Sequence, residues 1–119
     1  MADILIIDDD PQMRRLLTRI LTAAGHSVRE APDGTAGVAE FQRQRAALVI
    51  SDIVMPDMEG IETILALRRE QEDVPIIAIS GSSAPLYLEA AGRLGAAATL
   101  HKPFSSEDLL TLVEGLLAG

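Results

Sequence analysis

The sequence predicts a doubly wound α/β domain in which five parallel strands alternate with five helices. Short apolar runs alternate along the chain with longer segments whose apolar residues recur at helical period, a pattern typical of parallel strands joined by right-handed helical crossovers. The apolar runs are continuous, as expected for strands buried on both faces. A chain of 119 residues has room for one such domain, and we expect residues 1–119 to form it without a second domain.

The first strand–helix unit carries the clearest signals. Its strand covers about Asp3–Asp8, and Asp10 followed by Pro11 is typical of a helix cap and first turn. Gly25 is expected to end this helix. The apolar stripe that faces the sheet is predicted to contain Met13, Leu16, Leu17, Ile20 and Leu21.

The second strand is weaker, at about Ser27–Ala31, and Asp33 with the following glycine marks a turn into a helix that runs to about Arg45. The third strand, Ala46–Asp52, is strongly apolar. An irregular loop, Ile53–Gly60, separates it from the third helix. Loops at this end of the strands are where α/β sheets carry function.

The last two units complete the repeat. The fourth strand is Ile76–Ser80, and a helix is expected from Pro85 to Gly95. The fifth strand covers about Ala97–His101. Ser105 or Ser106 is expected to cap a final helix rich in leucine.

Acidic residues come directly after two of the predicted strands. Asp8 and Asp9 follow the apolar run Ile4–Ile7 of the first strand, and Asp52 ends the third. Because the carboxyl ends of parallel strands share one edge of a sheet, these acids are expected to meet there, together with Ser80 and Lys102. Crowded carboxylates repel one another, so a hard divalent cation is their natural partner.

The composition excludes several classes of function. A net charge of −8 disfavours direct nucleic-acid binding, because few cations are available to pair with phosphates. The absence of cysteine excludes disulfides and thiol chemistry. No apolar stretch approaches the ~20 residues that span a membrane, and we expect a cytoplasmic protein.

Four stretches of the chain together resemble the receiver domain of two-component response regulators, a CheY-like family. They are Ile4–Pro11 (ILIIDDDP), Leu48–Gly60 (LVISDIVMPDMEG), Ile79–Ser82 (ISGS) and His101–Phe104 (HKPF). The resemblance extends over the whole chain. It implies a flavodoxin-like fold with strand order 2-1-3-4-5 and a cis bond between Lys102 and Pro103.

The resemblance also implies roles for the residues at the sheet edge. Asp52 corresponds to the phosphoacceptor, Lys102 to the cation that pairs with it and then with the phosphoryl oxygens, and Ser80 to the switch hydroxyl. The resemblance assigns Mg²⁺ to the acids Asp8, Asp9 and Asp52 and to the backbone carbonyl of Val54.

A receiver takes its phosphoryl group from a histidine kinase or phosphotransfer protein, and it catalyses only its own phosphorylation and dephosphorylation. By the same resemblance, output is expected as contact with a downstream protein through the face formed by the fourth helix, fifth strand and fifth helix. We expect a monomer or weak dimer with no output domain.

Four positions depart from the family pattern or carry no expected role. Thr99 stands where receivers usually have an aromatic residue, so it cannot fill the pocket through which that residue signals. Val54 is apolar and cannot orient an attacking water, which predicts a long-lived phosphoryl group. His26 and His101 have no acid spaced to orient them and are expected to be bystanders.

Two alternatives share parts of this pattern. A Mg²⁺-dependent phosphohydrolase of dehalogenase type also uses aspartates at strand ends, but its motif after the first strand is Asp-x-Asp, whereas here Asp8 is followed by Asp9, Asp10 and Pro11. A flavin carrier of the same fold needs Ser, Thr and Gly in that loop. Three acids there would repel its phosphate.

Overall fold

The computed structural model describes residues 2–53, 60–71, 73–80 and 95–118. Strands and helices alternate along the described chain as the sequence predicts. The elements are β1 (Asp3–Ile7), α1 (Pro11–Ala23), β2 (Ser27–Ala31), α2 (Gly34–Arg43), β3 (Leu48–Asp52), α3 (Gly60–Glu70), β4 (Ile76–Ser80), β5 (Ala98–His101) and α5 (Ser106–Ala118). The helix predicted from Pro85 to Gly95 lies almost entirely outside the described residues.

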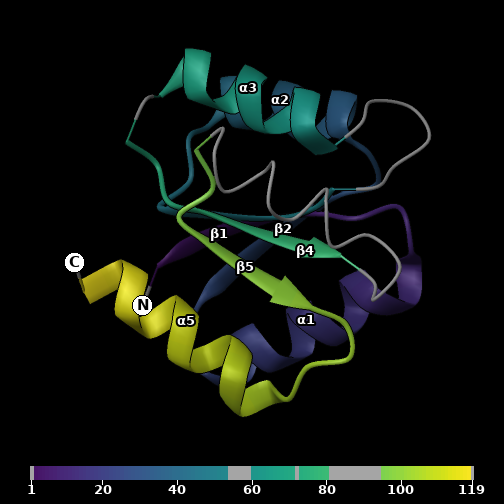
Figure 1. The fold of residues 1–119 in the computed structure, drawn as a ribbon, viewed down its shortest axis with the longest axis vertical. Helices are drawn as coiled ribbons and strands as arrows, with labels where there is room; N and C mark the ends of the chain where they lie inside the picture. Colours follow the sequence, from purple (N-terminus) through teal and green to yellow (C-terminus); the bar gives the residue numbers. More distant parts are fainter. Residues whose placement is uncertain (1, 54–59, 72, 81–94, 119) are drawn as a thin grey trace.

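The strands form one parallel sheet in the order β2-β1-β3-β4-β5, which confirms the doubly wound, flavodoxin-like topology. Helices cover both faces of the sheet: α1 and α5 lie on one side, and α2 and α3 on the other (Figure 1). The first strand pairs with both β2 and β3, so it is an interior strand and its carboxyl end lies beside that of the central strand β3.

Packing on both faces explains why β1 is apolar throughout. Ile4 and Ile6 join the core beneath α1 and α5, whereas Leu5 and Ile7 join the core beneath α2 and α3. All four side chains are fully buried. Burial of this kind stabilises the fold by ~25 cal/mol for each Å² of apolar surface removed from water.

The predicted helix starts are confirmed by side-chain caps. The Asp10 carboxylate accepts a hydrogen bond from the Gln12 N–H at 2.9 Å, directly before Pro11. The Asp33 carboxylate caps α2 in the same way, and the Ser105 hydroxyl accepts from the Asp108 N–H at 3.0 Å. Each cap satisfies a backbone donor that the helix leaves unpaired.

Two predicted boundaries were wrong by two residues, and one residue that was predicted to be buried is exposed. The second helix ends at Arg43 because Gln44 turns to an extended conformation. The third strand begins at Leu48, two residues later than expected. Leu16 was placed on the buried stripe of α1, but 41% of it is exposed, so the stripe is narrower than predicted.

One glycine is required by close packing between a helix and the sheet. The backbone of α2 passes over β1 at Gly37, where an added Cβ would overlap the side chain of Ile7. Gly37 is itself buried. This contact sets how closely α2 approaches β1, the strand that directly precedes Asp8.

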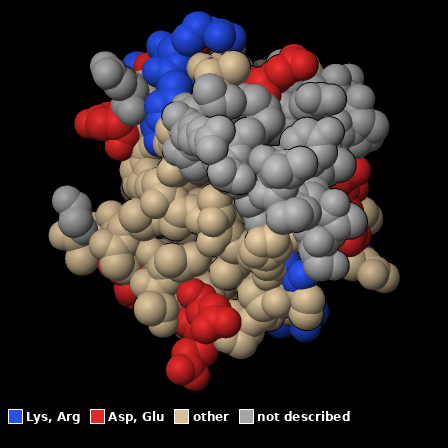
Figure 2. Space-filling view, viewed as in Figure 1, with Lys and Arg blue, Asp and Glu red and all other residues tan. Residues whose placement is uncertain are grey.

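Charge is unevenly distributed over the face seen in Figure 2. Lysine and arginine gather at its upper left. The lower left, where Figure 1 places α5, has uncharged atoms interrupted by an acidic patch, and α5 carries Glu107, Asp108 and Glu114. Thr99 is exposed on β5, whose residues alternate between half-buried and exposed. Among the described residues, no helix has the length and apolar character needed to cross a membrane.

Candidate functional site

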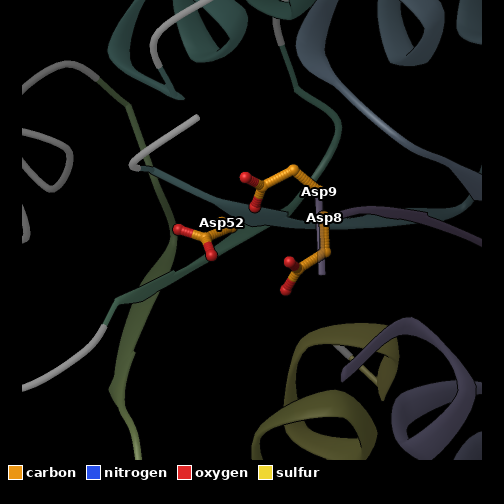
Figure 3. A group of neighbouring side chains, drawn as sticks. All are labelled: Asp8, Asp9 and Asp52. Carbon is orange, nitrogen blue, oxygen red and sulfur yellow. The ribbon is translucent and has the colours of Figure 1, made fainter. Parts of the chain in front are cut away.

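The sheet topology brings the predicted site residues to one edge. Asp52 is the last residue of β3, opposite Ile79 of β4, and Asp8 and Asp9 come directly after β1. One carboxylate oxygen from each of these acids lies within 4.8 Å of those of the other two. Figure 3 shows the three side chains at the ends of these strands. The predicted meeting of the three acids is confirmed.

Lys102 supplies the cation at this edge. Its Nζ donates to Asp52 Oδ2 at 3.0 Å and lies 3.7 Å from Asp8 Oδ2. Its backbone N–H donates to the Ser80 carbonyl at 2.7 Å, which extends the pairing of β4 and β5 by one residue. The bond between Lys102 and Pro103 is cis, as the family resemblance implies.

Asp8 is held in place from both its backbone and its side chain. Its N–H donates to the Ala31 carbonyl at 3.1 Å, and its Oδ1 accepts from the Asp10 N–H at 2.9 Å. Its Oδ2, which is buried, accepts no hydrogen bond from the described residues. An unsatisfied buried carboxylate oxygen is unusual and calls for a functional explanation.

Burial raises the pKa of Asp8 from 3.8 to about 6. The hydrogen bond from the Asp10 N–H and the charge of Lys102 oppose this shift, whereas the charges of Asp52 and Asp9 add to it. For Lys102, burial acts to lower the pKa, but the hydrogen bond to Asp52 and the charge of Asp8 outweigh it and raise the pKa overall. The lysine is therefore charged near neutral pH.

The three acids fit a hard divalent cation. Asp9 is exposed, so a cation could keep part of its hydration shell, and Asp8 Oδ2 offers an oxygen without a hydrogen bond. Mg²⁺ prefers one or two carboxylates together with water and phosphate oxygens. Val54, the predicted carbonyl ligand, lies outside the described residues.

Ser80 ends β4 at the same edge and is buried. This placement agrees with the predicted position of the switch hydroxyl. Thr99 lies on β5 with its side chain exposed. His101 is also exposed, on the last position of β5.

The expectation that no acid orients His26 was wrong. Its Nε2 lies 3.3 Å from Glu114 Oε2, and its Nδ1 accepts from the Ala2 N–H at 3.2 Å. Because Nδ1 is an acceptor, the proton is on Nε2 and is donated to Glu114. The acid lies on α5, 88 residues from His26 in sequence. The residues near His26 in the sequence therefore could not predict this contact.

One residue beside the site gave no signal in the sequence. Arg14 of α1 donates from Nη1 to the backbone carbonyl of Asp8 at 2.7 Å. Its Nε donates to Glu30 of β2 at 3.2 Å. Arg14 thus joins α1 and β2 to the turn that carries the acids.

Comparison with known protein families agrees with this geometry. The model of the response regulator receiver domain matches residues 4–114. The chain belongs to this family. Its receiver domain is therefore part of the two-component signalling class, and this membership favours the receiver prediction over the phosphohydrolase and the flavin carrier.

Curated relatives of the receiver domain differ in length. Protein PilH of Pseudomonas aeruginosa is 35% identical, with 100% of each chain covered. The probable transcriptional regulatory protein TcrX of Mycobacterium tuberculosis is 29% identical over 96% of this chain but only 49% of its own length. The chain spans 26% of the nitrogen assimilation regulatory protein NtrX of Azorhizobium caulinodans.

Solved structures share the same fold. The chemotaxis protein CheY4 of Vibrio cholerae superposes with a TM-score of 0.90 at 32% identity and 98% coverage of both chains. The receiver domain of NtrX from Brucella abortus gives 0.93 at 29% identity, again with 98% coverage of both chains.

Proposed function

We propose that this receiver domain accepts a phosphoryl group on Asp52 from a histidine kinase or phosphotransfer protein, with Mg²⁺ bound beside it. The observation that carries the proposal is the geometry of Asp52. Its carboxylate is held by Lys102 at 3.0 Å and lies within 4.8 Å of Asp8 and Asp9 oxygens. Asp52 lies at the strand end where this family places its acceptor.

In the proposed transfer, a carboxylate oxygen of Asp52 attacks phosphorus in line, and the bond from phosphorus to the donor's imidazole nitrogen breaks. The product is an acyl phosphate, and the leaving imidazole takes up a proton. Catalysis of this kind depends mainly on positioning and on neutralising the phosphoryl oxygens. Lys102 can contribute to positioning and to neutralisation, because its three N–H donors can hydrogen-bond first to Asp52 and then to the oxygens of the phosphoryl group.

Asp8, Asp9 and Asp52 would hold the Mg²⁺ ion, with the backbone carbonyl of Val54 as the further ligand that the family resemblance implies. Mg²⁺ bound there would neutralise the crowded carboxylates and polarise the phosphoryl oxygens. Ser80 is the proposed switch residue, whose hydroxyl donates to the phosphoryl group once it is attached.

Signalling is proposed to occur through contact with another protein. The described part of the candidate surface is β5 and α5. The partly buried Leu110 and Leu112 share α5 with the exposed acids Glu107, Asp108 and Glu114. The exposed Thr99 lies on the same strand. Because Thr99 cannot act as an aromatic switch, signalling is proposed to depend on Ser80 and the chain that follows it.

The test is phosphorylation by a small donor. Incubation with phosphoramidate and Mg²⁺ should add one phosphoryl group, seen by mass spectrometry of the intact protein, and chelation of Mg²⁺ should prevent it. Asp52→Asn should abolish the modification, whereas Asp33→Asn, at a helix cap outside the acidic cluster, should not. Undiminished modification of the Asp52 variant would disprove the proposal.

The same assay separates the alternatives. A phosphohydrolase would turn over many donor molecules for each protein molecule, and a flavin carrier would be yellow and unmodified. The long lifetime proposed from Val54 is tested by loss of the phosphoryl group with time, which should be slower than in Val54→Asn. A faster loss in the unmodified chain than in that variant would refute it.

A further inference from the structure

Asp8 and Asp9 share a single peptide group, and that group is held by a side chain from outside the acidic cluster. The Asp8 carbonyl belongs to the peptide that joins the two acids. Arg14 Nη1 donates to this carbonyl at 2.7 Å. Rotation of this peptide would turn the backbone at both Asp8 and Asp9, so the contact fixes the direction of two candidate metal ligands together.

The guanidinium is itself held in place. Arg14 Nε donates to Glu30 Oε1 at 3.2 Å, and the Thr18 hydroxyl donates to Glu30 Oε2 at 2.8 Å. Only 19% of the Arg14 side chain is exposed. A planar guanidinium offers donors in a fixed fork, so it can bond the Asp8 carbonyl and Glu30 at the same time. A lysine at this position could bond only one of them well.

The other hydrogen bonds of Asp8 hold its N–H and one carboxylate oxygen, but they do not hold its carbonyl. The Asp8 N–H is fixed by the Ala31 carbonyl, and its Oδ1 is fixed by the Asp10 N–H. With Arg14 on the carbonyl, Oδ2 is the one Asp8 oxygen that accepts no hydrogen bond from the described chain, and Lys102 lies 3.7 Å away.

Resting on the proposed function, we infer that Arg14 is a positioning residue for the metal site: by holding the peptide between Asp8 and Asp9, it aligns both acids for Mg²⁺. Arg14 acts through the backbone and touches neither the cation nor the phosphoryl group. Groups that orient metal ligands in this way typically contribute 10–100-fold to metal affinity.

The test compares Arg14→Met with Arg15→Met, which removes the same charge from an exposed position on the same helix. Isothermal titration calorimetry should show Mg²⁺ binding weakened by about 10-fold in the Arg14 variant and unchanged in the Arg15 variant. Phosphorylation from phosphoramidate should need correspondingly more Mg²⁺ for half-maximal rate, while the rate at saturating Mg²⁺ stays close to that of the unmodified chain.

Conservative variants separate positioning from general loss of structure. Arg14→Lys should restore part of the Mg²⁺ affinity, since an ammonium can still donate to the carbonyl. Glu30→Gln should weaken Mg²⁺ binding less than Arg14→Met, and it supplies the test if the methionine variant does not fold. Unfolding by urea in EDTA measures any purely structural loss.

Two results would overturn the inference in distinguishable ways. If the unmodified chain binds Mg²⁺ and is phosphorylated, but the folded Arg14 and Arg15 variants share its Mg²⁺ affinity, Arg14 does not position the site and the proposed function stands. If the unmodified chain neither binds Mg²⁺ nor accepts a phosphoryl group, both the proposed function and the role of Arg14 fall.

Discussion

The two ends of the parallel sheet treat buried polar groups in opposite ways. At the carboxyl end, Asp8 Oδ2 is buried without a hydrogen bond from the described residues, and burial raises the Asp8 pKa to about 6. At the amino end, both ring nitrogens of His26 have partners. There the guanidinium of Arg68 donates to the carbonyls of Val74 and Gly95, each at 2.5 Å.

Polar groups at the amino end of the sheet therefore stabilise the fold, whereas those at the carboxyl end form the candidate site. Hydrogen bonds at the amino end satisfy groups whose burial would otherwise cost free energy. The crowded acids at the carboxyl end keep an unfavourable interaction that a bound cation would relieve. Removing a buried charge at the carboxyl end should therefore raise stability, whereas removing a donor at the amino end should lower it, and only variants at the carboxyl end should change phosphorylation.

The largest expected effect comes from removing the cation at the carboxyl end. Lys102→Met should lower the rate of phosphorylation from phosphoramidate by about 100-fold, because it removes a positioned donor for the phosphoryl oxygens. Arg68→Met, which removes a cation at the other end, should leave this rate unchanged. Equal rates in the two variants would show that the cation at the carboxyl end has no special role in phosphorylation. Time courses by intact mass spectrometry measure both.

Asp8→Asn should raise the free energy of unfolding in EDTA by on the order of 2 kcal/mol, because it removes a buried charge whose pKa is shifted upward. Mg²⁺ should stabilise the unmodified chain and have little effect on the variant. Urea unfolding with and without Mg²⁺ measures both effects. A variant less stable than the unmodified chain in EDTA would show that the acid is stabilising after all.

The same substitution gives a pH dependence of known sign. Because the folded pKa of Asp8, about 6, exceeds its ordinary value of 3.8, the folded state binds the proton more tightly than the unfolded state. Its contribution to stability is present below pH 4 and is lost as pH rises through 6. In EDTA, the stability gain of Asp8→Asn should thus be small at pH 4 and reach its full size above pH 7. A gain independent of pH would contradict the assignment.

At the amino end, Arg68→Met should lower the free energy of unfolding by about 1–2 kcal/mol, because it leaves the Val74 and Gly95 carbonyls without these donors. Arg69→Met, at the exposed neighbouring position, is the matched control and should change stability little. Urea unfolding compares them. Similar losses in both variants would show that charge, and not the carbonyl contacts, matters here.

Glu114→Gln should have the smallest effect, below about 0.5 kcal/mol on the free energy of unfolding at neutral pH. The Glu114 side chain is 61% exposed, and a glutamine oxygen can still accept from His26. Thermal unfolding is sensitive enough to detect it. A loss of stability comparable to that of Arg68→Met would mean that the contact between His26 and Glu114 contributes strongly to the packing of α5 on the sheet.

The sequence predicts the acidic edge well for a simple reason. Asp8 and Asp52 directly follow or end continuous apolar runs, and parallel strands place such positions side by side. The caps at Asp10 and Asp33 are likewise local, so they could be recognised from neighbouring residues. The strand order required the family resemblance, since five apolar runs alone permit several arrangements.

Contacts between distant elements could not be predicted in this way. The partner of His26 lies on α5, and the partners of Arg14 lie on β2 and in the turn after β1. Neither relation has a fixed spacing in sequence. Leu16 shows a related limit, because helical period alone does not reveal how wide a stripe the sheet will cover.

The close approach of α2 to β1 bears on how genetic screens of this protein should be interpreted. Because any side chain at Gly37 would overlap Ile7, almost every substitution there should deplete the folded protein in the cell. A search for signalling-defective clones would then collect changes at Gly37 alongside changes at Asp52. Immunoblotting for protein abundance would separate the two groups, since only the Asp52 variants should be present in normal amounts while failing to signal.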